Sequence, residues 1–228
     1  MRALPATLLF LAALALLAAA PARAQTPPAQ AEIAQYRGLH AAIARGDGAG
    51  AAIFARDPTT IERRDGHGRT PLHVAAFVRR ADLVKLLIAH GADPDALDVD
   101  RYDAVTIAAV NDDEATLAAL LEAGASARLV TSPYDGTALI AAAHLGHDGV
   151  VRRLIAAGAP LDHVNNLGWT ALIEAVVLGD GGRRHLAIVD ALLNAGARRD
   201  IADRQGATPL MLAERRGFTA LAERLTAP

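Results

Sequence analysis

The chain has 228 residues, of which 52% are hydrophobic, 4% are aromatic and none is cysteine. Its alanine- and leucine-rich composition favours helices over strands, and the missing cysteines exclude disulfides, thiolate metal sites, cysteine nucleophiles and lipid attachment through a cysteine. A formal net charge of −2 lacks the basic excess that binding to nucleic-acid phosphates or polybasic attachment to a membrane requires.

The first 24 residues have the three parts of a secretory signal. A basic Met-Arg start precedes the apolar run 8–20, and an Ala-x-Ala cleavage motif ends at Ala24. The apolar run of 13 residues is too short to span a bilayer, which takes about 20. We therefore predict cleavage after Ala24 and a periplasmic or secreted protein without a stable membrane anchor, whose mature chain has 21 basic and 25 acidic residues.

A unit of about 33 residues repeats through the rest of the chain. Each copy opens on a motif such as GRTPLHVAA (68–76) and closes on a marker such as LLIAHGAD (86–93). The motif threonines are Thr70, Thr137, Thr170 and Thr208. A degenerate copy with Asp103 in the threonine position fills the gap of 67 residues between Thr70 and Thr137. After a short linker at 25–31, we predict six units, at about 32–63, 64–97, 98–130, 131–163, 164–201 and 202–228.

The residue types within one unit fit a pair of helices. Thr70 is a good N-cap, and Pro71 follows at the first helical position, where its missing N–H costs nothing. Gly91 is placed to end the second helix in the left-handed conformation that favours glycine. Asp103 is itself a competent cap, so we expect a helix to start there as well. Because one such pair cannot bury its own apolar face, stability requires a stack.

The 33-residue period together with TPLHVAA, Thr70 to Ala76, resembles the ankyrin repeat, and the resemblance covers about residues 32–227. It implies an all-α solenoid of helix-turn-helix units with β-finger loops, in which His73 forms hydrogen bonds around the Thr70 turn. It also implies a non-enzymatic protein-binding module. The extended fifth unit looks like a pattern of small exported bacterial ankyrin proteins, which implies an accessory or protective partner of another envelope protein. We expect a monomer without a cofactor.

The resemblance also implies where a partner protein would bind. In ankyrin stacks the fingertips and the first helices form a concave binding surface, and aromatic residues are favoured anchors at interfaces. All of the tyrosine and tryptophan residues of the central units fall on fingers, where local packing along the finger is the alternative interpretation. The candidate partner-binding residues are His67, Arg69, Phe77, Asp100, Tyr102, Asn111, Tyr134, His144, Asn166, Trp169, Val177 and Arg204.

Catalytic and metal-binding motifs are missing from the sequence. It contains no G-x-S-x-G, no H-E-x-x-H and no glycine-rich loop after a strand. His144 and His147 lie three residues apart, but nothing in the pattern supplies a third ligand. The acidic residues that recur at finger positions, such as Asp65, Asp98 and Asp203, are typical of Asx turns. We therefore expect neither an enzyme nor a metal site.

The stretch GDGGRRH, 179–185, departs from the repeat. The distance from the motif leucine to the closing glycine is 19 residues for Leu72 and Gly91 but 24 for Leu172 and Gly196, so we predict a lengthened turn that projects between two helices and can be shortened without loss of folding. The alternative functions are a small-ligand or anion site on this loop and an exported effector that binds host proteins. Backbone N–H groups and basic side chains would hold the anion at Gly181, Gly182, Arg183 and Arg184.

Overall fold

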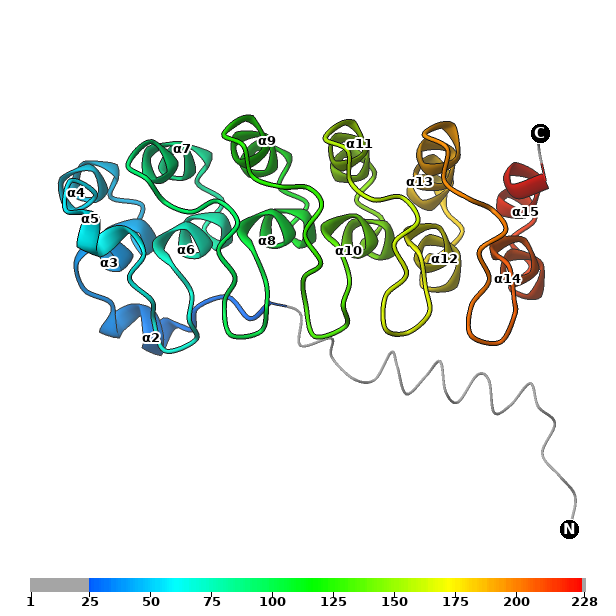
Figure 1. Ribbon diagram of the computed structural model, residues 1–228, viewed down its shortest axis with the longest axis horizontal. Coiled ribbons are helices and arrows are strands. Elements are labelled where there is room, and N and C mark those ends of the chain that lie inside the picture. Colours follow the sequence, from blue (N-terminus) through cyan, green and yellow to red (C-terminus); the bar gives the residue numbers. More distant parts are fainter. Residues whose placement is uncertain (1–24, 227–228) are drawn as a thin grey trace, which may run out of the picture.

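The structure is a computed structural model that describes residues 25–226, so the predicted signal segment and its cleavage site at Ala24 lie outside the described residues. Within this range the chain forms fourteen helices and no strand. Figure 1 shows the helices stacked as successive pairs along one axis, with a loop descending from each pair. The predicted all-α solenoid is confirmed.

The six units follow one another in chain order. The first contains four short helices, and each of the others contains two. Their bounds are α2 (Gln30–Gln35), α3 (Gly38–Ala44), α4 (Gly48–Phe54) and α5 (Pro58–Ile61); α6 (Pro71–Phe77) and α7 (Ala81–Ala89); α8 (Ala104–Val110) and α9 (Glu114–Glu122); α10 (Ala138–Leu145) and α11 (Asp148–Ala156); α12 (Ala171–Val177) and α13 (Arg183–Asn194); and α14 (Pro209–Arg215) and α15 (Thr219–Thr226).

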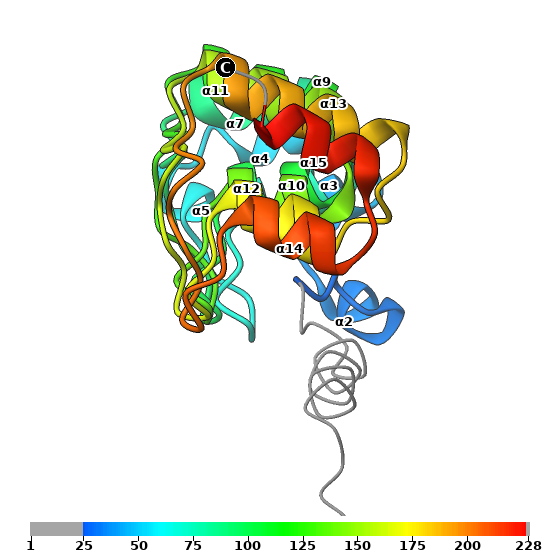
Figure 2. The same ribbon diagram turned by 90° about the vertical axis from the view of Figure 1, so that its right-hand side faces the viewer.

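The helices form two parallel layers. An inner row runs from α3 through α6, α8, α10 and α12 to α14, and an outer row runs from α4 to α15 (Figures 1 and 2). A single apolar core continues through all six units, with fully buried leucines such as Leu72, Leu139 and Leu172 at the motif position. The loops that precede the inner helices, which we call fingers, all lie on one side of the stack (Figure 2). The inner helices and the fingers together form the concave face.

Thr70 and Asp103 occupy the N-cap positions of α6 and α8, as predicted. The Thr70 N–H donates to His73 Nδ1 at 3.1 Å, and His73 Nε2 lies 2.9 Å from the carbonyl oxygen of Tyr102 in the next unit. His73 therefore forms the local bonds that the resemblance implied and also joins two units. Asp103 replaces threonine by accepting the Thr106 N–H at 2.8 Å, and its burial raises its pKa to about 6.

The fingers are turns held by polar side chains rather than strand hairpins. Asp98 accepts the N–H groups of Asp100 and Tyr102, both at 2.9 Å, and the same pattern recurs at Asp65, Asn165 and Asp203, which confirms the Asx interpretation. Within residues 25–226 the expected β-character is limited to one isolated bridge between Thr131 and Gly136. The side-chain acceptor replaces most of the cross-strand bonding that a hairpin would need.

The insertion in the fifth unit differs from the prediction. The turn 178–182 has five residues where the second and third units have three, but α13 also has 12 residues where α7 and α9 have nine. The insertion is packed rather than projecting, because His185 is buried, with Nδ1 2.8 Å from Asp180 Oδ1 and Nε2 3.3 Å from the His144 carbonyl oxygen. The position of Gly181 against the Phe218 ring fixes the turn to the sixth unit.

Candidate binding surface on the concave face

The predicted partner-binding residues differ widely in exposure. Five are exposed (His67, Asp100, Tyr134, Asn166 and Arg204), and four are half-buried (Phe77, Asn111, His144 and Trp169). Three are buried, with exposed fractions of 2% for Arg69 and 5% for Tyr102 and Val177. These three side chains support the face from below, because packing and internal hydrogen bonds already occupy them. The surface available to a partner is therefore formed by the other nine and by neighbours that the sequence analysis did not select.

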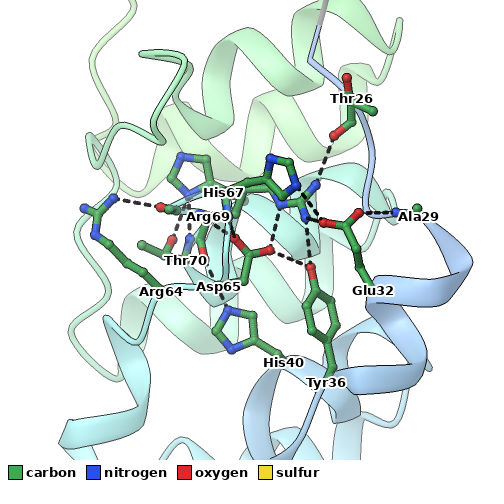
Figure 3. Close-up of polar contacts among 12 residues, drawn as sticks. Thr26, Ala29, Glu32, Tyr36, His40, Arg64, Asp65, His67, Arg69 and Thr70 are labelled. Atoms are coloured by element: carbon green, nitrogen blue, oxygen red, sulfur yellow. Dashed lines mark hydrogen bonds and ion pairs between the residues drawn. The ribbon is translucent and has the colours of Figure 1, made fainter.

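Arg69 is buried because the N-terminal arm, residues 25–37, folds back onto it. Its Nη2 lies 2.7 Å from Glu32 Oε1, its Nε lies 2.7 Å from Asp65 Oδ2, and its Nη1 donates to the Thr26 carbonyl oxygen at 3.1 Å. Tyr36 completes the cluster by donating its hydroxyl to Asp65 Oδ2 at 2.6 Å (Figure 3). A charged group without water needs several such partners, and the arm supplies most of them.

The charges of this cluster are mutually satisfied. Burial opposes the ionised form of Asp65, but hydrogen bonds from Tyr36 and Arg69 outweigh it and lower the pKa of this carboxyl. Burial likewise opposes ionisation of Glu32, and the Ala29 N–H together with Arg69 brings its pKa below the usual value. The sequence analysis treated 25–31 as a linker and did not foresee this contact, since partners 37 residues apart give no local signal.

A groove of about 480 Å³ lies on the concave face between the third and fifth units. Its walls come from α8, α10, α12 and the fingers before them, and its apolar lining residues are Tyr102, Val110, Tyr134, Ile140, Leu145 and Leu167. Tyr134 is 41% exposed and Leu145 is 43% exposed, so apolar surface of this groove remains in contact with solvent. Gln25, the first residue of the N-terminal arm, also lines the groove.

Glu174 is the unusual polar residue of this groove. It is only 3% exposed, its Oε1 accepts the Asn165 side-chain amide at 3.0 Å, and its Oε2 has no hydrogen-bond partner within the described part of the chain. The His144 Nδ1 atom lies 3.5 Å from Oε2. Burial raises the pKa of Glu174 to about 7 and lowers the pKa of His144. Each side chain is thereby shifted toward its neutral form.

Glu174 is not among the predicted site residues, although the sequence contains a signal for it. Every other full unit has an apolar residue at this motif position, namely Val74, Ile107, Ala141 and Leu212. Val74, Ile107 and Leu212 are buried at this position and Ala141 is half-buried, so a glutamate there is largely withdrawn from solvent. A charged residue at one copy of a position that is otherwise apolar is therefore a clue to a binding site.

The candidate anion loop has already formed internal contacts. The Gly182 N–H donates to Asp180 Oδ1 at 2.8 Å, and Arg184 Nη1 lies 3.3 Å from Asp112 Oδ2. Arg183 and Arg184 belong to the first turn of α13, and both are exposed. A carboxylate of the chain thus occupies a position where an anion would sit, and no contact of this loop favours a ligand.

His147 contacts a backbone carbonyl group of the preceding unit. His147 Nδ1 lies 2.9 Å from the Ala109 carbonyl oxygen, where it joins two units, and this contact does not involve His144. Across residues 25–226, no three histidine or acidic side chains gather as metal ligands would. In the same range, none of the helices combines the length and the apolar character needed to cross a bilayer.

Comparisons with known proteins agree with this architecture. The family "Ankyrin repeats (3 copies)" matches residues 105–198 and 139–227, and the family "Ankyrin repeat" matches residues 67–99. The ankyrin repeat protein YahD of Escherichia coli (strain K12) is 37% identical over 168 residues, which cover 73% of this chain and 83% of YahD.

Solved structures give the same result. An ankyrin repeat domain from Acinetobacter baumannii AYE has 41% sequence identity and a TM-score of 0.78, with coverage of 82% of this chain and 95% of that domain. The ankyrin repeat domain of Bcl-3 has 26% identity and a TM-score of 0.76, with coverage of 85% of this chain and 87% of that domain. The similarity extends over nearly the whole described stack in both cases.

Proposed function

Because this chain belongs to the ankyrin repeat family, whose repeats are protein–protein interaction modules and generally not enzymes, we propose that it binds a partner protein of the bacterial envelope on its concave face. The partner would lie between the third and fifth units, beyond the end of the N-terminal arm. A stacked array presents a long, continuous surface there, which suits an extended protein ligand better than a small molecule.

The groove between the third and fifth units is the observation that carries this proposal. Tyr134, Leu145 and Leu167 give it apolar surface that the fold does not cover. An apolar patch rimmed by polar residues is typical of an interaction site, and a central tyrosine is a favoured anchor. Elsewhere on the concave face, the N-terminal arm covers the second unit.

The location in the envelope rests on the sequence of the first 24 residues and on the bacterial relatives. A cleaved secretory signal would deliver the chain across the inner membrane, and two similar proteins come from Escherichia coli and Acinetobacter baumannii. The test is to fractionate producing cells and to sequence the N-terminus of the purified protein. A periplasmic or secreted protein that begins at Gln25 is expected; an intact N-terminus in the cytoplasm would contradict this part of the proposal.

Partner binding is tested by crosslinking in the envelope fraction. Tyr134→Ala and Leu145→Ala remove apolar contacts from the groove and should each weaken capture of a discrete partner at least tenfold, without a change in thermal stability. Ile53→Ala is the matched control, because Ile53 is 65% exposed on α4 in the outer row. Tyr102 is unsuitable for this test because it is buried. Equal capture by the groove variants and the control would refute the concave site.

A further inference from the structure

We propose that the groove accepts a basic side chain from an extended segment of the partner protein, and that Glu174 receives its cationic head group. This inference rests on the proposed function, since it names the chemistry of the ligand at the same site. It is carried by a buried carboxylate with an unpartnered oxygen on an otherwise apolar surface.

The charges that face the groove favour a cation. Among the described residues that line the groove, Glu174 is the only one with a carboxyl group, and none is a lysine or an arginine. From α10, His144 faces Glu174, and burial lowers the pKa of this imidazole, so it is mainly neutral at pH 7. From the preceding finger, Asn165 contributes an uncharged amide, and from α13, His185 points to the His144 carbonyl oxygen. A cation would meet attraction here and no fixed positive charge.

The unpartnered oxygen, Glu174 Oε2, favours a ligand that donates a hydrogen bond. A buried acceptor without a hydrogen bond costs free energy, and a donor that reaches it recovers this cost. Glu174 Oε2 is such an acceptor, and the neighbouring His144 side chain is 41% exposed, so the surrounding fold does not enclose it. A guanidinium or ammonium group forms the stronger, charge-assisted kind of hydrogen bond with a carboxylate. The structure thus lacks one donor, and a basic side chain supplies it.

The apolar walls of the groove suit the methylene groups of a basic side chain. Lysine and arginine carry three or four methylene groups that pack on apolar surface while the head group finds a polar partner. Ile140, Leu145 and Leu167 supply such surface beside Glu174, and the half-exposed ring of Tyr134 supplies an aromatic face of the kind that attracts cations. A groove of about 480 Å³ also has room for residues on either side of the basic one.

Gln25 offers hydrogen-bonding atoms to the backbone of an extended ligand. The N-terminal arm runs along the finger side of the stack (Figure 1), where Arg69 donates to the Thr26 carbonyl oxygen. Gln25, the first described residue of the arm, lines the groove. Within residues 25–226, neither amide atom of the Gln25 side chain has a hydrogen-bond partner, although Gln25 is buried. A ligand in extended conformation would offer these atoms a carbonyl oxygen and an N–H while its basic side chain reaches Glu174.

The test uses the full chain and two blocked tripeptides. The probe is N-acetyl-leucyl-arginyl-leucinamide, and its matched control contains citrulline, a neutral isostere, in place of arginine. At pH 8, nitrogen–proton correlation spectra should show the arginine peptide binding at the groove at least tenfold more tightly than the citrulline peptide. Because the pKa of Glu174 is about 7 and a cation favours its ionised form, this ratio should fall below threefold at pH 5.5.

A variant separates Glu174 from the rest of the groove. Glu174→Gln keeps an oxygen for Asn165 but cannot ionise, so it should weaken the arginine peptide at least tenfold and leave the citrulline peptide unchanged. Glu114→Gln is the control, since Glu114 lies on α9 and pairs with Arg153 outside the groove. Equal binding of the two peptides, no detectable binding of either, or an unchanged arginine affinity in Glu174→Gln would overturn the inference. If Tyr134→Ala still lost the captured partner in that case, the proposed function would stand without it.

Discussion

Two buried ionisable side chains lie on the same concave face, and their surroundings differ. Arg69 in the second unit and Glu174 in the fifth are 2% and 3% exposed. Arg69 has ionic or hydrogen-bonding partners in Asp65 and throughout the N-terminal arm. Glu174 Oε2 has no hydrogen-bond partner among the described residues, and only the His144 Nδ1 atom, 3.5 Å away, is recorded as an ion-pair contact of this oxygen. A buried charge that the chain itself surrounds belongs to the fold. A buried carboxyl with an unpartnered oxygen is instead the position at which we propose that a ligand binds.

The pKa shifts of the carboxyl groups agree with this difference in contacts. In the Arg69 cluster, hydrogen bonds and opposite charges overcome burial and lower the pKa of Glu32 and Asp65, so their ionised forms stabilise the folded state. At Glu174, burial dominates and raises the pKa to about 7, so ionisation destabilises the folded state. We call the part of the concave face around Arg69 the closed half, because the chain itself satisfies its charges. We call the groove around Glu174 the open half, because it contains a buried carboxyl with an unpartnered oxygen.

The largest expected effect tests the closed half. Arg69→Met keeps most of the apolar volume but removes the charge, which leaves Asp65 and Glu32 without their cation. Breaking a buried ion pair in this way costs about 3 kcal/mol of unfolding free energy, which urea denaturation at pH 7 would measure. Arg198→Met is the matched control, because the Arg198–Asp200 pair is exposed and should change stability by less than about 0.5 kcal/mol. Equal losses in the two variants would remove the distinction between the halves.

The next effect tests the open half. The pKa of Glu174 is about 7 in the folded state and near 4.5 in the unfolded chain, so the folded state holds a proton that the unfolded chain loses between these values. The unfolding free energy should therefore fall as the pH rises from about 4.5 to about 7. Glu174→Gln abolishes this contribution of the carboxyl and should stabilise the protein by about 3 kcal/mol at pH 8, with no gain at pH 4.

Glu114→Gln is the control for this measurement too, since Glu114 is exposed and its ion pair with Arg153 lies at the surface. Urea denaturation of the three proteins across this pH range gives the comparison directly. A stability gain of Glu174→Gln that is equal at pH 4 and pH 8 would mean that the carboxyl is not buried in its neutral form. The open half would then differ from the closed half only in its apolar surface.

The same contrast explains how much the sequence could predict. Helix starts at Thr70 and Asp103 and the finger turns at Asp65 and Asp98 depend on neighbours within four residues, so the sequence is sufficient to locate them. The contact between the N-terminal arm and Arg69 was not predicted, because Arg69 is far along the chain and its sequence position is typical of an exposed finger residue. This contact exists only once the second unit has folded.

Glu174 and the insertion were missed for two further reasons. The burial of Glu174 depends on the neighbouring units, and only a comparison of motif positions between units reveals that the site is otherwise apolar. The five extra residues were all assigned to a turn, but Asp180 and His185 pair across that turn and start α13 early. Spacing counts residues between two markers; it does not divide them between a helix and its turn.

A smaller effect tests whether the insertion belongs to the packed part of the molecule. Gly181 and Gly217 both have a φ of +69°, but an added methyl group at Gly181 would lie 2.8 Å from the Phe218 ring, whereas the space around Gly217 is open. Alanine at either position is strained by its backbone conformation. Gly181→Ala should therefore cost about 1 kcal/mol more than Gly217→Ala in thermal or urea unfolding. Equal costs would indicate that the turn is loosely held.

The smallest effect tests whether the loop is a second open site. Arg184 is exposed, and its contacts with Asp112 and Asp148 lie at the surface, so Arg184→Ala should change the unfolding free energy by less than about 0.5 kcal/mol. Because Asp180 already accepts the Gly182 N–H, titration calorimetry with inorganic phosphate should detect no binding to the wild-type chain or to Arg184→Ala. Saturable phosphate binding that Arg184→Ala abolishes would place an open site on the outer side of the stack. The distinction between a closed and an open region would then extend beyond the concave face.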